Sequence, residues 1–155
     1  MIFKKKKPYF ISPCGGELIT IQEVQDPVFS EKMMGDGFGI IPTGETLISP
    51  VTGWVTAVYP TYHAIGITTE KKEEILLHIG LKSFSLKGKG LTSTLKKGQK
   101  VKQGDTILKY DLNEFYKHQI DPTCVIVFTS GEKVTLLKKR KRVEIGESDF
   151  IEVYK

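Results

Sequence analysis

The sequence is poor in cysteine and has no long apolar run. Cys14 and Cys124 are the only cysteines, and neither belongs to a CxxC motif or a Cys/His cluster. A disulfide framework or a cysteine-based structural zinc site is therefore not expected. No apolar stretch reaches the ~18–20 residues of a membrane-spanning helix, and lysines rather than apolar residues follow MIF at the start. We therefore expect a cytoplasmic protein without a membrane span.

Positive charge is in moderate excess, with 23 Lys and Arg against 18 Asp and Glu and a formal net charge of +5. Much of it lies in two runs, KKKK at 4–7 and KKRKR at 138–142. Basic runs can bind nucleic acids or anionic membranes, but neither run has interleaved aromatic residues or a nucleic-acid motif. We interpret residues 1–8 as a basic tail and 9–155 as a single domain, with no nucleic-acid partner.

Long helical periodicity is almost absent. Short apolar or alternating runs recur every ~8–12 residues between turn-forming clusters, which predicts a mostly β protein. Short helices are expected at 27–34 and at 112–120, the latter with Asn113 as N-cap. The predicted strands are 9–12, 17–21, 38–41, 46–49, 53–59, 63–68, 74–79, 91–94, 106–110, 124–128, 133–137 and 150–154.

An internal repeat adds to this pattern. ISPCGGELITI at 11–21 and ISPVTGWVTAV at 48–58 share Ile-Ser-Pro and a glycine at the sixth position. A second echo pairs VKQGD at 101–105 with VEIGE at 143–147, each with glycine before an acid, as in tight turns. Two related halves packed face to face, as a small sandwich or barrel, would explain both echoes. Coincidence among common turn sequences is the alternative.

Two histidines, His63 and His78, lie in neighbouring β-prone runs. In 74–81, alternation places Ile75, Leu77, Ile79 and Leu81 on one face and His78 on the other. In an antiparallel hairpin, the residue numbers of every opposed pair add up to the same sum. That sum is odd when the loop has an even number of residues, and the numbers of His63 and His78 also add up to an odd number. A loop of two or four residues therefore places both imidazoles on one face, whereas a one-residue shift separates them.

Two imidazoles on one face permit three interpretations. A neutral imidazole is a competent nucleophile for phosphoryl transfer, and its neighbour can donate a hydrogen bond to phosphoryl oxygens. A catalytic zinc site needs at least one further protein ligand, and the sequence shows no HxH or HExxH motif nearby. Both rings can also be ordinary surface residues.

At these residues the chain closely resembles the glucose-type IIA domain (EIIA-Glc family) of the bacterial phosphoenolpyruvate-dependent sugar phosphotransferase system. The resemblance implies an all-β fold, a compact antiparallel β-sandwich or barrel built from a duplicated, lipoyl-carrier-like hybrid motif. It spans nearly the whole chain and rests on SPCGGELI at 12–19, VFSEKMMGDGFGIIP at 28–42, HAIGI at 63–67, EILLHIGL at 74–81, LKGKGL at 86–91 and GQKVKQGDTILKYDL at 98–112.

The resemblance implies a phosphocarrier. His78 matches the histidine that takes a phosphoryl group on Nε2 from the phosphocarrier HPr and passes it to a IIB domain of a sugar permease. His63 matches the histidine that hydrogen-bonds the phosphoryl group, and Thr61 matches the hydroxyl residue that helps to orient it. Gly80 matches the residue whose carbonyl holds Nδ1 of His78.

The resemblance also implies a partner-binding patch around the histidines. Lys82 stands where the family usually has an acid, which predicts retained chemistry with an altered preference for HPr or IIB. It can also steer the phosphoryl group or lower the pKa of His78 by repulsion. The expected partner-binding residues are Asp36, Phe38, Ile40, Ile65, Leu76 and Lys82.

Two other functions stay open at this point. A non-catalytic domain that regulates transporters or kinases would use the same face. A zinc hydrolase is disfavoured because a third ligand is missing, and no cofactor is required, although a zinc ion held by His63, His78 and a partner carboxylate is compatible with the sequence.

Overall fold

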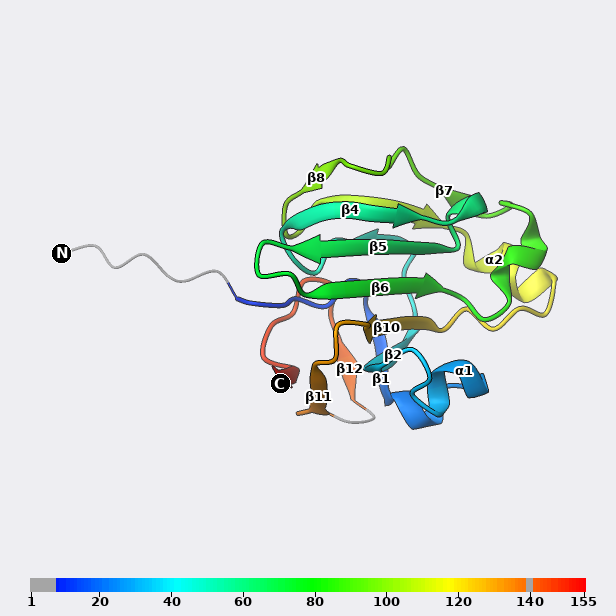
Figure 1. Ribbon diagram of the computed structural model, residues 1–155. Coiled ribbons are helices and arrows are strands. Elements are labelled where there is room, and N and C mark those ends of the chain that lie inside the picture. Colours follow the sequence, from blue (N-terminus) through cyan, green and yellow to red (C-terminus); the bar gives the residue numbers. More distant parts are fainter. Residues whose placement is uncertain (1–7, 139–140) are drawn as a thin grey trace.

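The computed structural model describes residues 8–138 and 141–155, and strands dominate it (Figure 1). The helices are α1 (Pro27–Ser30) and α2 (Leu112–Lys117), with 3₁₀ turns η1 (Ile21–Glu23), η2 (Pro60–Tyr62) and η3 (Ser83–Leu86). The strands are β1 (Gly16–Thr20), β2 (Asp36–Pro42), β3 (Thr46–Ile48), β4 (Gly53–Val58), β5 (Ala64–Thr69), β6 (Glu74–Ile79), β7 (Leu91–Thr92), β8 (Lys100–Val101), β9 (Thr106–Tyr110), β10 (Cys124–Phe128), β11 (Lys133–Leu136), β12 (Arg142–Val143) and β13 (Ile151–Tyr154).

The strands form a large sheet and two small ones, all with antiparallel neighbours. The large sheet has the order β12-β1-β2-β10-β6-β5-β4-β8, and the small ones are β3-β9-β7 and β11-β13. The main core lies between the large sheet and β3-β9-β7, since Phe38 and Leu77 of the former and Leu47 and Leu108 of the latter share one buried cluster. The predicted all-β sandwich is thus confirmed.

The internal repeat is a real structural duplication. Gly16 of the first copy pairs with Val143, and Gly53 of the second pairs with Val101, so each Ile-Ser-Pro repeat is joined to one copy of the Gly-acid turn. The same backbone bond recurs, from Ser12 N–H to Glu147 O (2.9 Å) and from Ser49 N–H to Asp105 O (2.8 Å). The halves also join side by side, at the β10–β6 pair in the middle of the large sheet, in addition to the face-to-face packing that the sequence predicted.

Several element boundaries differ from the sequence prediction. Residues 9–12 form no strand, although Phe10 is buried against Phe38 and Phe128. The two-residue strands β8 and β12 were missed because alternation cannot show over so short a run. Helix α2 begins after Asp111, whose carboxylate accepts the Asn113 N–H at 2.9 Å, so Asp111 rather than Asn113 is the N-cap.

Parts of both basic runs lie outside the described residues. Of the predicted tail at 1–8 only Pro8 is described, and residues 139–140 of the second run also lie outside the described residues. No helix in the described ranges has the length and apolar character needed to cross a membrane. Cys14 and Cys124 are both buried in the main core.

Candidate functional site: a histidine pocket

The β5–β6 hairpin has a different register from the one predicted. Ala64 lies opposite His78, because residues 70–72 form a turn of odd length closed by Thr69 N–H and Glu73 O at 2.9 Å. Lys72 in this turn has a left-handed backbone with φ of 70°. The prediction of an even-length loop was therefore wrong. The hairpin instead has the one-residue shift that was expected to separate the histidines.

The histidines nevertheless meet, because His63 precedes the strand. Thr61 and Tyr62 have left-handed φ values of 64° and 61°, and His63 itself is right-handed helical with φ of −71° and ψ of −17°. These angles break the alternation of strand side chains at the start of β5. The rings of His63 and His78 lie 5.7 Å apart between centroids, at an interplanar angle of 70°.

His63 is held by its own turn. Its Nδ1 lies 2.7 Å from the Pro60 carbonyl oxygen and 3.3 Å from Thr61 Oγ1. A carbonyl oxygen only accepts hydrogen bonds, so Nδ1 carries the proton and Nε2 is left for the pocket. Thr61 thus lies where it orients His63, consistent with the role that the family resemblance implies.

His78 presents Nε2 to the pocket. Its Nδ1 atom is buried and makes no hydrogen bond of good geometry within the described residues, whereas its ring as a whole is half-buried. The accessible ring nitrogen is therefore Nε2. The expected neighbour of Nδ1, Gly80, acts on the ring through its backbone and raises the pKa of His78. A Cβ at Gly80 (φ of 77°) would lie 2.5 Å from Phe115 Cε1, so the turn requires glycine.

Burial controls the protonation of His78. Desolvation is the largest effect and lowers the pKa of His78 from 6.5; the Gly80 backbone opposes it, His63 adds a smaller lowering effect, and Asp26 adds a still smaller raising effect. The net direction is downward, so the imidazole is neutral near pH 7 and its lone pair is available. Lys82 is not among the groups that shift this pKa, and the expected repulsion between Lys82 and His78 is therefore not supported.

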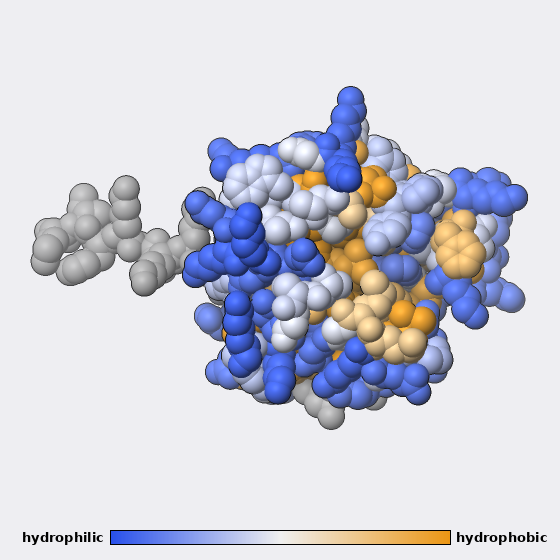
Figure 2. Space-filling view, viewed as in Figure 1, coloured by the Kyte–Doolittle hydropathy of each residue, from blue (hydrophilic) through white to orange (hydrophobic). Residues whose placement is uncertain are grey.

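An apolar collar surrounds the two rings. The cavity holds about 250 Å³. Phe29 packs edge-on against His78 at 5.0 Å between centroids, and Phe84, which is 61% exposed, lies 6.3 Å from His63. Figure 2 shows apolar surface gathered in a hollow on this face. The lining residues are Asp26, Val28, Phe29, Met34, Tyr59, His63, Ala64, Leu76, His78, Lys82 and Phe84.

Three of the expected partner-binding residues cannot reach a partner. Phe38, Ile40 and Ile65 are 0% exposed and belong to the main core between the sheets. Because strand side chains alternate, they point away from the face that carries His78. These three predictions are wrong. Leu81 also differs from its predicted face: it packs in the outer cluster, because the left-handed Gly80 ends the alternation.

The other three expected residues have different positions. Leu76 and Lys82 line the histidine cavity. Asp36 does not: its carboxylate accepts the N–H groups of Gly37 (2.9 Å) and Val134 (3.0 Å) and pairs with Lys32 at 3.5 Å. The role of Asp36 in these contacts is to stabilise the fold. Sequence reasoning predicted a short helix at 27–34 but assigned none of its residues to the site. The lining residues that it missed are Asp26, Val28, Phe29, Met34, Tyr59, Ala64 and Phe84.

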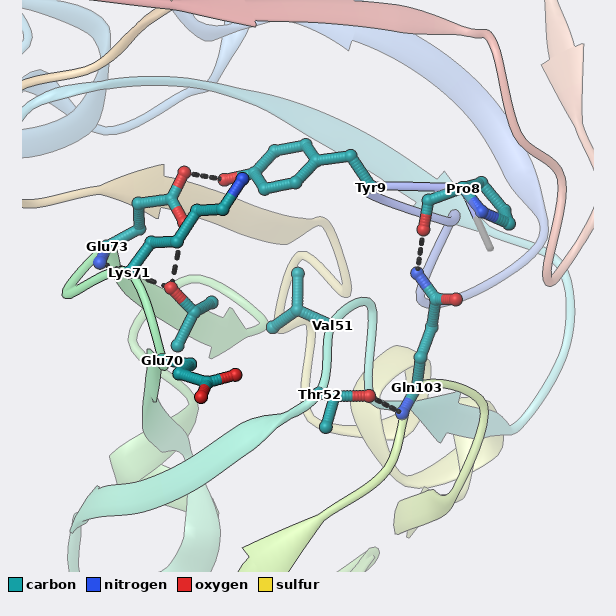
Figure 3. Close-up of a pocket in the computed structure, with 9 residues that line it drawn as sticks. Pro8, Tyr9, Val51, Thr52, Glu70, Lys71, Glu73 and Gln103 are labelled. Atoms are coloured by element: carbon teal, nitrogen blue, oxygen red, sulfur yellow. Dashed lines mark hydrogen bonds between the residues drawn. The ribbon is translucent and has the colours of Figure 1, made fainter. Parts of the chain in front are cut away.

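A second cavity, of about 200 Å³, lies at the turn end of the same hairpin (Figure 3). The Tyr9 hydroxyl donates a hydrogen bond to the Glu73 carboxylate, and Gln103 Nε2 donates to the Pro8 carbonyl at 2.8 Å. The first bond fastens the start of the described chain to the hairpin, and the second fastens it to the turn between β8 and β9. None of the residues that line this cavity is a histidine or a cysteine, so the histidine pocket is the better candidate for chemistry.

Known proteins share the sequence pattern and the fold of this chain. Residues 9–134 match the family described as phosphoenolpyruvate-dependent sugar phosphotransferase system, EIIA 1. The glucose-specific EIIA component of the phosphotransferase system of Mycoplasma capricolum is 39% identical over 155 residues, the full length of both chains. A solved structure titled glucose permease IIA from Mycoplasma capricolum aligns with a TM-score of 0.82 and 38% identity, over 97% of this chain and 99% of that one.

A longer relative carries the same region. The glucose-specific EIICBA component of Streptococcus pneumoniae is 40% identical over 139 residues, which are 90% of this chain but 19% of that protein. Together these matches define a phosphotransferase component of a sugar phosphotransferase system. Within that system, the chain belongs to the EIIA 1 family.

Proposed function

We propose that the chain carries a phosphoryl group on Nε2 of His78, accepting it from phosphorylated HPr and passing it to a IIB domain of a sugar permease. The observation that supports this best is a neutral imidazole whose Nε2 is accessible and whose ring lies 5.7 Å from a second imidazole. Because relatives are named glucose-specific, we propose a glucose-type permease as the acceptor, and a cytoplasmic location where HPr is encountered.

The transfer is a single displacement. The lone pair of His78 Nε2 attacks phosphorus and a new N–P bond forms, while the bond from phosphorus to the donor histidine nitrogen breaks and its electron pair returns to the donor ring. The Nδ1 proton stays on His78. Such a step depends mainly on in-line positioning and charge stabilisation. Phe29, packed edge-on against His78, supplies positioning by fixing the ring.

His63 supplies charge stabilisation. Since its Nδ1–H is directed at the Pro60 carbonyl, its Nε2 is the nitrogen available to the phosphoryl group. In its protonated form His63 donates Nε2–H to a phosphoryl oxygen, where a fixed donor stabilises the charge of the transition state. Thr61 keeps the ring in place through its contact with Nδ1.

The apolar collar fits two partners that dock in turn. Val28, Met34, Tyr59 and Phe84 are exposed large apolar residues that line one cavity, an arrangement typical of a protein-binding surface. We propose that HPr and the IIB domain both contact this collar, with Leu76 at its floor.

A resident metal is not part of the proposal. His63 and His78 offer two ligands, and within the described residues no three His, Cys, Asp or Glu side chains are grouped to hold an ion. A zinc ion at these histidines would need a carboxylate from a docked partner.

The experiment is a labelling reaction with phosphoenolpyruvate, enzyme I and HPr. The wild-type chain should gain one acid-labile phosphoryl group, and omission of HPr should prevent it. A folded wild-type chain that binds HPr but stays unlabelled would instead indicate a regulatory domain that uses the same face.

A further inference from the structure

Lys82 has an unusual position in the histidine pocket. Among the residues that line the cavity, Asp26 and Lys82 are the only ones with a full charge at neutral pH. The Asp26 carboxylate caps α1 by accepting the Val28 N–H at 3.0 Å. The Lys82 side chain makes no ion pair or hydrogen bond with any other described residue, and it is exposed. The pocket therefore holds one uncommitted positive charge.

The backbone directs this lysine toward the pocket at some energetic cost. Lys82 has left-handed angles, φ of 58° and ψ of 28°, which cost a non-glycine residue about 1 kcal/mol. Its carbonyl accepts hydrogen bonds from Ser85 N–H (3.1 Å) and Ser85 Oγ–H (2.8 Å), and Leu81 N–H donates to Asp121 O (2.9 Å). Backbone strain that the surroundings fix in this way is often found at functional positions.

On the basis of the proposed function, we propose that Lys82 is a positioning residue whose ammonium neutralises the phosphoryl group on His78. The phosphoryl group would extend from the accessible Nε2 into the cavity that Lys82 lines, where it brings close to two negative charges. In the unphosphorylated state the ammonium has no partner and lies in water, which agrees with its lack of influence on the pKa of His78. The attraction thus appears only once phosphate is bound.

This role differs from that of a charge at the rim of a docking surface. A rim charge changes the association rate with HPr and leaves the equilibrium between donor and acceptor unchanged. A charge that contacts the phosphoryl group changes that equilibrium, because only the phosphorylated protein gains the interaction. The equilibrium constant for transfer between phospho-HPr and this chain therefore separates the two roles.

The chain offers a matched control in Lys87. Lys87 is also exposed and left-handed, with φ of 52°, and lies at the other end of η3, but it does not line the histidine cavity. Asparagine tolerates left-handed angles better than most residues. Lys82→Asn and Lys87→Asn therefore each remove one charge without adding strain, and Lys82→Arg keeps the charge.

The test equilibrates each variant with a fixed ratio of phospho-HPr to HPr and measures the phosphorylated fraction. Lys82→Asn should lower the equilibrium constant ~3- to 10-fold, the size expected for one partly screened charge beside a phosphate. The equilibrium constants of Lys87→Asn and Lys82→Arg should stay within about twofold of the wild-type value, because the first removes a charge outside the cavity and the second keeps the charge. The phosphorus-31 shift of phospho-Lys82→Asn should also report a raised phosphoryl pKa.

Two results overturn the inference. One is an equal equilibrium constant for Lys82→Asn and Lys87→Asn. The other is a Lys82→Asn variant that is phosphorylated at a different rate but to the same extent, which would make Lys82 a docking residue. Either result leaves the phosphocarrier function intact, whereas an unlabelled wild-type chain would contradict that function and not the role of Lys82 alone.

Discussion

The two halves of the large sheet have the same arrangement of strands, but only the second half contains the histidine pocket. Since Gly16 opposite Pro42 corresponds to Gly53 opposite Thr69, β2 corresponds to β5 and β10 to β6. If residues are counted from these pairs, Asp36 at the start of β2 corresponds to His63 just before β5. Val127, paired with Leu76 across the centre, occupies the position of His78.

The halves differ in what covers their outer face. In the first half the segment of η1 and α1 folds over the sheet, and its residues Ile21, Val24 and Phe29 share one buried cluster with Val127, which is fully buried. In the second half this face is left open as the histidine pocket. Phe29 of α1 packs against His78 and lines the histidine cavity, so the segment that covers the first half also forms a wall of the site in the second half. The duplicated strands thus carry a candidate site only in the half whose outer face η1 and α1 leave uncovered.

The sharpest test of this difference compares the two corresponding positions in β6 and β10. His78→Ala should abolish labelling, because it removes the nitrogen that attacks phosphorus, and His63 is placed as the hydrogen-bond donor to the phosphoryl group and not as its carrier. Val127→Ala should label normally at saturating HPr while losing roughly 1–3 kcal/mol of unfolding free energy, as for other cavity-forming substitutions. Labelling with phosphoenolpyruvate and a denaturant titration check both. Full labelling of folded His78→Ala would contradict the assignment of His78 as the phosphoryl carrier.

The second pair, His63 and Asp36, should separate charge stabilisation from fold stability. His63→Gln should slow labelling ~10²-fold or more, the usual cost of losing one fixed donor at a transition state. Asp36→Asn removes a charge that holds two backbone N–H groups, so it should lower stability by ~1–2 kcal/mol with little change in rate. Rapid-quench kinetics measure the rates, and similar slowing in both variants would contradict the distinction.

A smaller effect is expected from the collar. Phe84→Ser should raise the KM for HPr about 5- to 10-fold with kcat nearly unchanged, because the residue contributes to docking and not to the displacement. Ile145→Ser, also at an exposed apolar residue but outside the histidine cavity, is the control and should leave KM unchanged. A lowered kcat in Phe84→Ser would place this ring in the reaction itself.

The smallest effect concerns pH and belongs to the second half alone, since Val127 has no proton to bind. The folded-state pKa of His78 is lowered below 6.5, so between that pKa and 6.5 the unfolded chain binds more protons. The stability contributed by neutral His78 is therefore present above pH 6.5 and is lost as pH falls. Denaturant titrations at pH 7.5 and 5.5 should show a larger loss for wild type than for His78→Gln. Equal losses would contradict the burial argument.

Much of the frame could be predicted from the sequence. The limits of β6, β9 and β10 agree with the predicted runs because each is a β-prone, largely apolar stretch between turn residues. The duplication was visible because Ser12 and Ser49 close the same turn in both halves. The two-residue strands β8 and β12 are too short to show such a pattern, so they were identified only in the structure.

The site was less accessible to sequence reasoning. The pairing of His63 with His78 was expected from a register that proved wrong, and the left-handed angles of Thr61 and Tyr62 restored the shared face. Pattern alone does not reveal such angles in residues other than glycine. The partner patch failed for a related reason, since Phe38 and Ile40 are apolar and belong to a family-like segment but point to the core.

The most direct test of the account is nuclear magnetic resonance of the phosphorylated chain with nitrogen-15-labelled histidines. The account predicts one phosphorus coupled to Nε2 of His78, with the resonances of His63 shifted but not coupled to phosphorus. Coupling to Nδ1 of His78, or to either nitrogen of His63, would contradict the assignment of His78 Nε2 as the phosphoryl carrier.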